Sequence, residues 1–279
     1  MAWKPRTLLW SICLCTVSAM PALAGEAGNP MLNARIGLLG GAFFSFIDTN
    51  LRLDASDGDF GTDIDVEELL GMDDTKTTPF GGLWWRITPK HRLSAEYFEL
   101  SRNGHVSATR DIEWGDVTFP VGASLDSHYR WKVGRVAYRY SFVNDGEKEL
   151  GLALGLHIAE VAAKLSGEVT AGDAGVRFST ESGEVTLPLP NVGLVGAYAF
   201  NDRLAVSLDA TGFYLSVDDL TGWIVRADAS VTYHPFAHVG FGAAYSLFNV
   251  SYEDKSDNGH RFRAEQLFHG PRIYAVVTF

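Results

Sequence analysis

The sequence predicts an all-β protein, an antiparallel up-and-down transmembrane β-barrel of about ten strands, with eight or twelve strands as alternatives. Three observations predict this fold. Apolar residues alternate with small or polar ones over long stretches, the connections between these stretches are alternately short and long, and the chain ends on an aromatic residue after a further alternating run. No later apolar stretch reaches the length of a spanning helix.

Residues 1–24 have the layout of a secretory signal peptide. Lys4 and Arg6 precede a short apolar run, and Ala22-Leu23-Ala24 supplies an Ala-x-Ala cleavage pattern. The run is shorter than the roughly 20 residues that a spanning helix needs. We therefore divide the chain into a signal peptide (1–24), a periplasmic N-terminal segment (25–34) and a transmembrane β-barrel (35–279).

The composition excludes several classes of function. The two cysteines, Cys13 and Cys15, both lie in the signal peptide, so the mature chain is expected to have no disulfide, thiol nucleophile or thiolate metal site. A formal net charge of −11 argues against a nucleic-acid partner, because phosphate binding needs basic patches. No phosphate loop or cofactor motif is present in the sequence, and we expect no cofactor.

The alternation divides the barrel region into ten segments. They lie at 35–53, 78–87, 91–107, 125–142, 149–165, 185–200, 203–215, 223–234, 238–252 and 260–279. In the clearest segment, leucines from Leu150 to Leu156 share one face, and Gly151, Ala153 and His157 lie on the other. Because the second face is small or polar, we expect the apolar face to meet lipid. In the fourth segment the alternation slips near Gly134, where we expect a β-bulge.

The connections between the segments indicate which end of the barrel is which. Short connections occur at 88–90, 144–148, 201–202 and 235–237, and longer polar stretches at 54–77, 108–124, 166–184, 216–222 and 253–259. In membrane barrels the short turns face the periplasm and the longer loops face the outside. This arrangement predicts that both termini are periplasmic. Aromatic residues beside the short turns, such as Tyr138 and Tyr140, are expected to form an interfacial girdle.

The last residues form an alternating run with Ile273, Ala275, Val277 and Phe279 on one face. This ending resembles the assembly signal of bacterial outer-membrane barrels, although Tyr274 stands where such signals often have glycine. The resemblance implies residence in the outer membrane, in contact with its lipids and lipopolysaccharide. It also implies the barrel-assembly machinery and periplasmic chaperones as partners in transit.

Over residues 35–279 the sequence is similar to the small single-chain barrels of the OmpA-like superfamily. Within that class it resembles an outer-membrane subgroup that shares an acidic first loop, here residues 63–72, and a second segment, here residues 110–120. The resemblance implies the barrel fold and no particular activity or surface ligand.

Charged residues gather on the face that is predicted to line the lumen. They are Arg86, Glu96, Arg135, Arg139, His157, Asp209, Arg226, Asp228 and Arg272. Opposite charges in a narrow barrel should pair, because unpaired ions in a low-dielectric interior are costly. The arginines outnumber the acids, so the surplus must reach water or a loop carboxylate. We expect a salt-bridge network that closes the lumen, with a thin polar path for water or small solutes as the alternative.

The acidic first loop is a candidate calcium site. Asp57, Asp59, Asp63 and Asp65 offer oxygen ligands, but their spacing misses the EF-hand pattern, and we favour a solvated acidic loop. In the same loop, Asp65 with Glu68 forms a capping box and Gly71 is a plausible stop. One or two helical turns between them would place Val66, Leu69 and Leu70 on the barrel rim.

Some outer-membrane barrels are lipid-modifying enzymes or proteases, which need a histidine beside a serine or an acid. His105, His128, His260 and His269 could lie near the loops, but no motif joins one of them to a serine. We therefore do not expect an enzyme. The predicted function is a structural or surface-interaction barrel with a narrow, charge-filled lumen, and a slow small-solute pore is the alternative.

Overall fold

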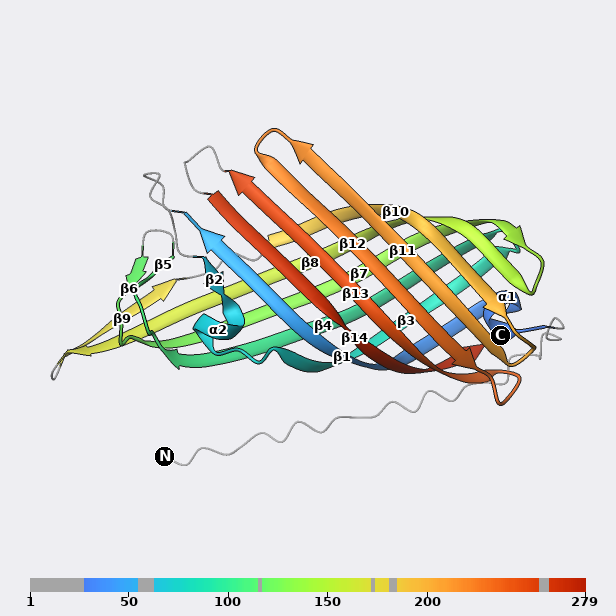
Figure 1. Cartoon of the computed structure of the whole chain (residues 1–279), viewed down its shortest axis with the longest axis horizontal. Coiled ribbons are helices and arrows are strands. Elements are labelled where there is room, and N and C mark those ends of the chain that lie inside the picture. Colours follow the sequence, from blue (N-terminus) through green and yellow to red (C-terminus); the bar gives the residue numbers. More distant parts are fainter. Residues whose placement is uncertain (1–27, 55–62, 115–116, 172–173, 181–184, 256–260) are drawn as a thin grey trace, which may run out of the picture.

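The computed structural model describes residues 28–54, 63–114, 117–171, 174–180, 185–255 and 261–279. These residues form a closed barrel of long antiparallel strands (Figure 1). The predicted signal peptide lies outside the described residues and stays a prediction. No helix in the described part of the chain is long and apolar enough to cross a membrane.

Ten long strands make up the barrel wall, as the alternation predicted. They are β1 (Ile36–Leu53), β3 (Thr75–Thr88), β4 (His91–Ser107), β7 (Ser124–Asn144), β8 (Lys148–Ala171), β10 (Val185–Ala199), β11 (Leu204–Val217), β12 (Leu220–Tyr233), β13 (Val239–Lys255) and β14 (Arg261–Thr278). Each pairs with its neighbours in the chain, and β1 pairs with β14 to close the barrel. The up-and-down topology is therefore confirmed.

The remaining elements are short and lie in the connections. They are the strands β2 (Ile64–Asp65), β5 (Ile112–Trp114), β6 (Val117–Phe119) and β9 (Ala174–Thr180), and the helices α1 (Pro30–Asn33) and α2 (Val66–Leu70). Strand β2 pairs with β1 and β9 pairs with the end of β8, and among the described residues β5 pairs only with β6. All but α1 belong to the long connections.

The two ends of the barrel differ, and we call them the short-turn end and the long-loop end. At the short-turn end the last residue closes the barrel beside the first strand: Phe279 N donates to Ile36 O (2.8 Å), and Ile36 N donates to Phe279 O (2.9 Å). Helix α1 lies at the same end, with Leu32 buried against Ala199 and Ala205. Both ends of the described chain are thus on one side of the barrel (Figure 1).

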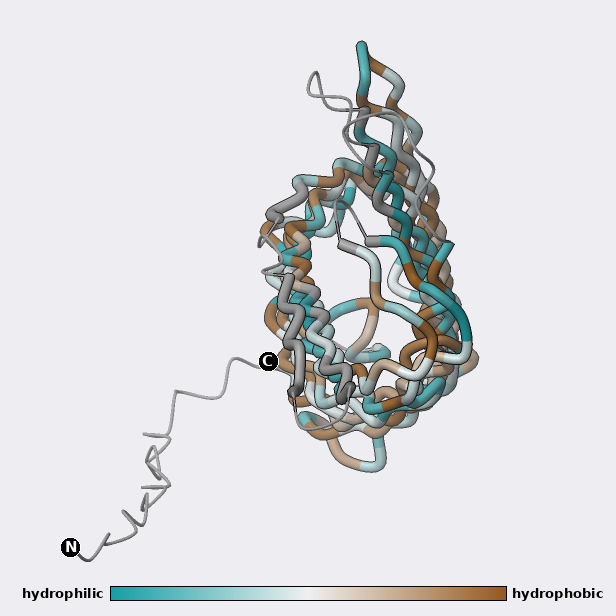
Figure 2. The backbone as a smooth tube through the Cα atoms, turned by 90° about the vertical axis from the view of Figure 1, so that its left-hand side faces the viewer, coloured by the Kyte–Doolittle hydropathy of each residue, from teal (hydrophilic) through white to brown (hydrophobic). Residues whose placement is uncertain are grey.

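The two faces of the wall are oriented as predicted. Leu154 on β8 is 61% exposed, whereas the neighbouring Ala153 is buried. The same alternation recurs on the other strands, so exposed apolar side chains form a belt around the outside. Figure 2, a view from the long-loop end, shows the wall as a ring around the lumen. Such a belt is suited to lipid rather than to water.

The predicted bulge at Gly134 is wrong. Gly134 pairs regularly with Tyr97 and Ile158, and the irregularity in β7 lies between Ser141 and Val143. The pattern slips at Gly134 because both faces change character there. Toward the long-loop end the outward residues become charged as the strand leaves the apolar belt, while the inward residues change from arginine to apolar side chains.

Candidate functional site in the barrel lumen

Four of the predicted luminal residues form a compact square of charges. Glu96 lies 3.3 Å from Arg226 and 3.2 Å from Arg272, and Asp228 lies 2.8 Å and 3.2 Å from the same two guanidinium groups. Both arginine side chains are largely buried. Each carboxylate therefore bridges two arginines, one from β12 and one from β14.

The other ionised residues extend this cluster toward the short-turn end. Asp209 pairs with Arg135 (3.4 Å) and Arg139 (3.7 Å), and Arg139 and Arg86 both reach Glu149 (3.6 and 2.9 Å). We call these residues, together with Glu96, Arg226, Asp228 and Arg272, the charge cluster. Eight of the nine predicted residues belong to it. His157 also points inward but makes no ion pair with a described residue: its Nδ1 lies 2.7 Å from Asn191 Nδ2, and its ring packs edge-on against Phe248.

Two members of the lumen escaped the sequence prediction. Glu149 is buried, and besides its two arginines it accepts a hydrogen bond from Ser141 Oγ (2.6 Å). It was treated as a strand start, although it shares a face with Gly151 and His157. Arg92, which alternates with Glu96, stacks over the Trp84 ring with its guanidinium carbon 4.5 Å from the ring centroid. The predicted positive surplus is thus only partly offset by carboxylates.

On the long-loop side of the charge cluster, the lumen is filled with aromatic side chains, which the sequence analysis did not predict. A chain of edge contacts, with ring centroids 5.5 to 6.5 Å apart, links Phe43, Phe98, Phe268, Trp131 and Phe248 in that order. We call this set the aromatic layer. Its signal in the sequence was the inward alternation itself, which changes from charged to aromatic along β4, β7 and β14. The lumen is therefore not filled by charge alone.

Helix α2 occupies the lumen beyond the aromatic layer. As predicted, the Asp65 side chain caps it by accepting from Glu68 N (2.7 Å), and it ends at Gly71, whose φ is +61°. However, Val66 and Leu70 are buried inside the barrel rather than laid on its rim. Gly104 on β4 makes this possible, because a Cβ there would lie 2.0 Å from Leu70 O.

One arginine anchors α2 to the wall. The Arg102 guanidinium is almost completely buried and donates to Glu67 on α2, to Thr49 Oγ1 (2.6 Å) and to Asp73 O (3.1 Å). Thr49 Oγ1 in turn donates to Gln266 Oε1 (3.0 Å), which also accepts from Tyr129 Oη (2.7 Å). Sequence reasoning missed this anchor, because it treated Glu67 as one of several solvated loop acids.

The candidate calcium site is only partly described. Asp57 and Asp59 lie outside the described residues. Asp63 pairs with Arg52 (3.2 Å) and Asp65 caps α2, so both already have protein partners. The described part of the chain contains no group of three or more histidine and acid side chains arranged to hold a metal.

The described side chains leave little free space in the lumen. A cavity of about 20 Å³ separates the charge cluster from the aromatic layer, which is room for about one water molecule. A second cavity of about 160 Å³ lies on the short-turn side of the cluster and reaches Arg92 and Tyr274. Three successive layers, made of charged residues, aromatic residues and α2, therefore obstruct any straight path through the barrel.

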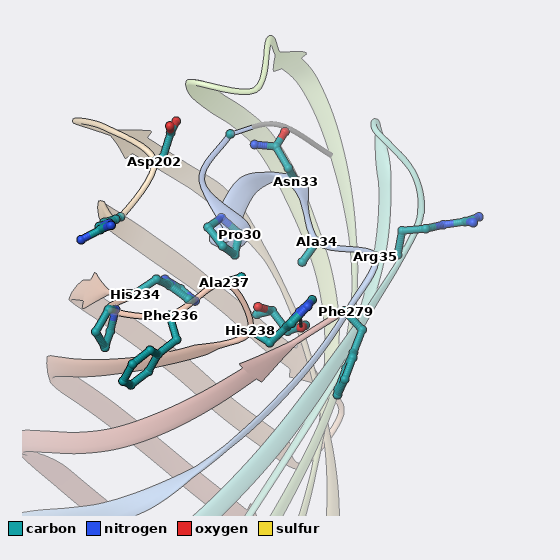
Figure 3. Close-up of a pocket in the computed structure, with 14 residues that line it drawn as sticks. Pro30, Asn33, Ala34, Arg35, Asp202, His234, Phe236, Ala237, His238 and Phe279 are labelled. Atoms are coloured by element: carbon teal, nitrogen blue, oxygen red, sulfur yellow. Dashed lines mark hydrogen bonds between the residues drawn. The ribbon is translucent and has the colours of Figure 1, made fainter. Parts of the chain in front are cut away.

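A larger pocket of about 680 Å³ lies outside this obstruction, at the short-turn end (Figure 3). It is formed by α1 and the turns, with Arg35, His234, His238 and Phe279 among its lining residues. His238 is hydrogen-bonded through Nδ1 to Thr278 O (2.8 Å), and its ring stacks on Phe279. Burial lowers the pKa of His234 below its ordinary value.

Three of the four histidines considered as catalytic candidates have a side-chain partner, and for His105 that partner is an acid. His105 Nδ1 lies 2.7 Å from Asp126 Oδ1, and His128 Nδ1 lies 2.6 Å from Asn103 Oδ1. His269 Nδ1 is hydrogen-bonded to the Tyr245 hydroxyl. No serine hydroxyl is bonded to these three rings in the described structure. His260 lies outside the described residues.

The residues of the predicted assembly signal share the outer face of β14 and its end. Ile273, Ala275 and Phe279 are exposed, and Val277 is half-buried. Tyr274, the departure from the usual signal, points into the lumen, where its hydroxyl lies 2.7 Å from Thr232 Oγ1. Gly242 makes room for its ring, since a Cβ there would lie 2.2 Å from it.

No protein-family model and no curated protein matches this sequence. The structure is similar to that of the outer membrane protease OmpT from Escherichia coli, with a TM-score of 0.55 and 13% sequence identity over 88% of this chain and 96% of that one. The chain has the fold of the outer-membrane β-barrels. At this identity, the likeness to OmpT extends to the fold alone.

Two other solved barrels match over similar lengths with lower TM-scores. The outer membrane protein OprG from Pseudomonas aeruginosa has a TM-score of 0.38 and 11% identity, over 90% of this chain and 98% of that one. The attachment invasion locus protein Ail of Yersinia pestis has a TM-score of 0.28 and 10% identity, over 85% and 97%.

Proposed function

We propose that this protein is an outer-membrane β-barrel with a closed lumen, which serves a structural or surface-interaction role without catalysing a reaction. The observation that supports this role most directly is the filling of the lumen by the charge cluster, the aromatic layer and α2. The charge cluster and the aromatic layer each take side chains from several strands, and Arg102 anchors α2 to the wall, so solute passage would require several residues to rearrange together.

The proposed placement has both termini in the periplasm and the long loops outside the cell. It is supported by the apolar belt and by the gathering of the short turns and Phe279 at one end. In the membrane the belt would contact lipid and lipopolysaccharide. We propose that the barrel-assembly machinery reads the outward residues of β14, after periplasmic chaperones have delivered the chain.

A pair of substitutions on β8 tests the membrane placement. Leu154→Arg puts a charge on the outer belt and should cost about 2–4 kcal/mol of barrel stability. Ala153→Ser is the matched control, because Ala153 is the next residue in β8 and faces the lumen. Heat-modifiable migration of the outer-membrane fraction measures assembly. Equal assembly of both variants would contradict the placement.

Conductance in a planar bilayer tests the closed lumen. The refolded wild-type barrel should give no discrete conductance steps, whereas Glu96→Ala removes a carboxylate from between Arg226 and Arg272 and should produce steps. Stable steps from the wild-type protein would overturn the closed lumen. They would instead support a slow small-solute pore, a second candidate favoured by the 160 Å³ cavity beside the cluster.

A further inference from the structure

The barrel wall has a gap between β10 and β11 at the long-loop end. The ladder between these strands stops at Val192 and Gly212. Beyond that point β10 stays paired with β8 as far as Val185, and β11 stays paired with β12 as far as Val217. In Figure 1 the β11–β12 hairpin leans away from β10 at the top of the view. We call the space between residues 185–191 and 213–217 the seam.

Two prolines explain why the ladder stops. Pro188 and Pro190 have no N–H group to donate, yet β10 remains paired with β8 at both positions. The missing donors therefore belong to the edge of β10 that faces β11. An edge without donors cannot continue a ladder, which is why proline is confined to such edges in sheets. The seam is thus encoded in the sequence of β10.

The lumen-side face of β11 next to the seam is apolar, and the described residues leave it exposed. Phe213, Leu215 and Val217 share this face with the inward residue Asp209, and they are 37%, 36% and 53% exposed. Across the β11–β12 ladder, Phe213 lies opposite Ile224, a fully buried member of the lumen's apolar core. An apolar surface therefore runs without interruption from the interior of the barrel to the seam.

The lower part of the seam opens at the level of the apolar belt. Val192 at its base is exposed on the outer face. The positions opposite Pro190 and Pro188 on β8 are Leu156 and Ile158, which are also exposed to the outside. The next outward residue along β8 is Glu160, where the belt ends. A molecule that enters the seam at this level would come from the hydrocarbon phase.

We infer that the seam binds an acyl chain of a membrane lipid, which enters between β10 and β11 and packs against Phe213 and Leu215. The described walls of the seam carry no charged side chain below Asp218, so hydrocarbon suits them better than a polar solute does. The prolines also remove two N–H groups that would otherwise be costly to expose to lipid. This inference rests on the proposed membrane placement but not on the closed lumen.

Photochemical labelling from the bilayer tests the inference. The full mature chain is refolded into phosphatidylcholine vesicles that contain a phospholipid with a diazirine on its acyl chain, and labelled residues are mapped by mass spectrometry. We expect label at Phe213 and Leu215 as well as at Leu154 on the outer belt. Ile47, an inward residue of β1 that is buried beside α2, serves as the lumen-side control and should stay unlabelled.

The Pro188→Val, Pro190→Val double variant provides the specific control. Restored N–H groups should let the ladder extend. Phe213 and Leu215 should then lose their label, whereas Leu154 should keep its label. Label at Leu154 with none at Phe213 in the wild type would overturn the seam inference alone. Absence of label at Leu154 as well would overturn the membrane placement on which it rests.

A second copy of the chain is the competing occupant, because an unpaired strand edge can pair with another chain. The mature chain is expected to lack cysteine, so a Leu215→Cys variant can be cross-linked without background. Efficient dimer formation through position 215, together with absence of acyl-chain label at Phe213, would contradict the proposal in favour of self-association.

Discussion

In the part of the chain that the structure describes, two gaps interrupt the ladders at the long-loop end, and they are alike in origin. Pairing between β3 and β4 ends at Phe80 and Phe98, and pairing between β10 and β11 ends at Val192 and Gly212. In both cases proline stands just beyond the last pair, Pro79 in β3 and Pro190 in β10. Each proline remains paired with the strand on its other side, so the donorless edge faces the gap.

The two gaps differ in what lies behind them. Segment 63–74 lies behind the first, because Asp73 O accepts from Arg102 on β4 and Asp74 O accepts from Ile47 N on β1. Leu100, on the lumen face of β4 beside this gap, is only 2% exposed, whereas Leu215 beside the seam is 36% exposed. A gap is sealed when a nearby loop supplies apolar side chains for the apolar residues beside the gap and hydrogen-bond partners for the polar groups there.

The largest difference in stability should appear when the contacts that hold segment 63–74 behind the gap between β3 and β4 are removed. Arg102→Ala leaves Glu67 without its buried partner and removes the donor to Asp73 O, which should lower the free energy of unfolding by about 3–5 kcal/mol. Arg263→Ala is the matched control, because Arg263 makes a half-exposed pair with Glu253 (3.0 Å) worth about 0–1 kcal/mol. Urea unfolding in lipid measures both. Similar losses would show that the buried anchor has no special role.

A second comparison uses one leucine from each gap. Leu100→Ala creates a cavity in a packed interior and should cost about 2–5 kcal/mol. Leu215→Ala removes a side chain that has little cover in the protein, and should change stability by about 0.5 kcal/mol or less. The same unfolding assay in lipid-free detergent measures the pair. An equal cost at both positions would mean that the seam is covered by protein.

The contrast between the gaps also shows what the sequence could and could not predict. Alternation identified the ten strands and their faces, because each strand has one lipid-facing and one lumen-facing side. It identified eight members of the charge cluster for the same reason. The Asp65 N-cap and the stop at Gly71 were local signals, and both are present.

The remaining features depend on which residues meet across the barrel, and alternation carries no information about that. Arg102 and Glu67 are 35 positions apart in sequence and become partners only when α2 folds inward. The aromatic layer was missed because an inward aromatic residue looks out of place in a lumen that is assumed to be polar throughout. The seam required the ladder register, although Pro188 and Pro190 were visible in the sequence.

A smaller effect on stability is expected at the C-terminal end of α2, the helix that lies behind the gap between β3 and β4. Gly71 has a φ of +61°, which disfavours residues with a side chain, and a Cβ there would lie 3.4 Å from His105 O. Gly71→Ala should therefore cost about 1 kcal/mol, measured by urea unfolding. Gly134→Ala is the control, since the nearest atom to a Cβ there, Ile158 O, is 4.0 Å away. A Gly71→Ala variant as stable as Gly134→Ala would argue against a specific stop at this residue.

The smallest change in stability should come from the prolines, where two effects oppose each other. Pro188→Val with Pro190→Val gives the unfolded chain more freedom, which costs about 0.4–1 kcal/mol for each proline. New ladder hydrogen bonds to β11 would return about 0.5–1.5 kcal/mol each. The net change should be small, but hydrogen exchange should show new protection of those amides in residues 213–217 that face β10, since the alternate ones already donate to β12. Pro79→Val is the control, because α2 already seals that gap and β11 should be unaffected. Unchanged exchange in β11 of the double variant would mean that something other than the missing donors keeps the seam open.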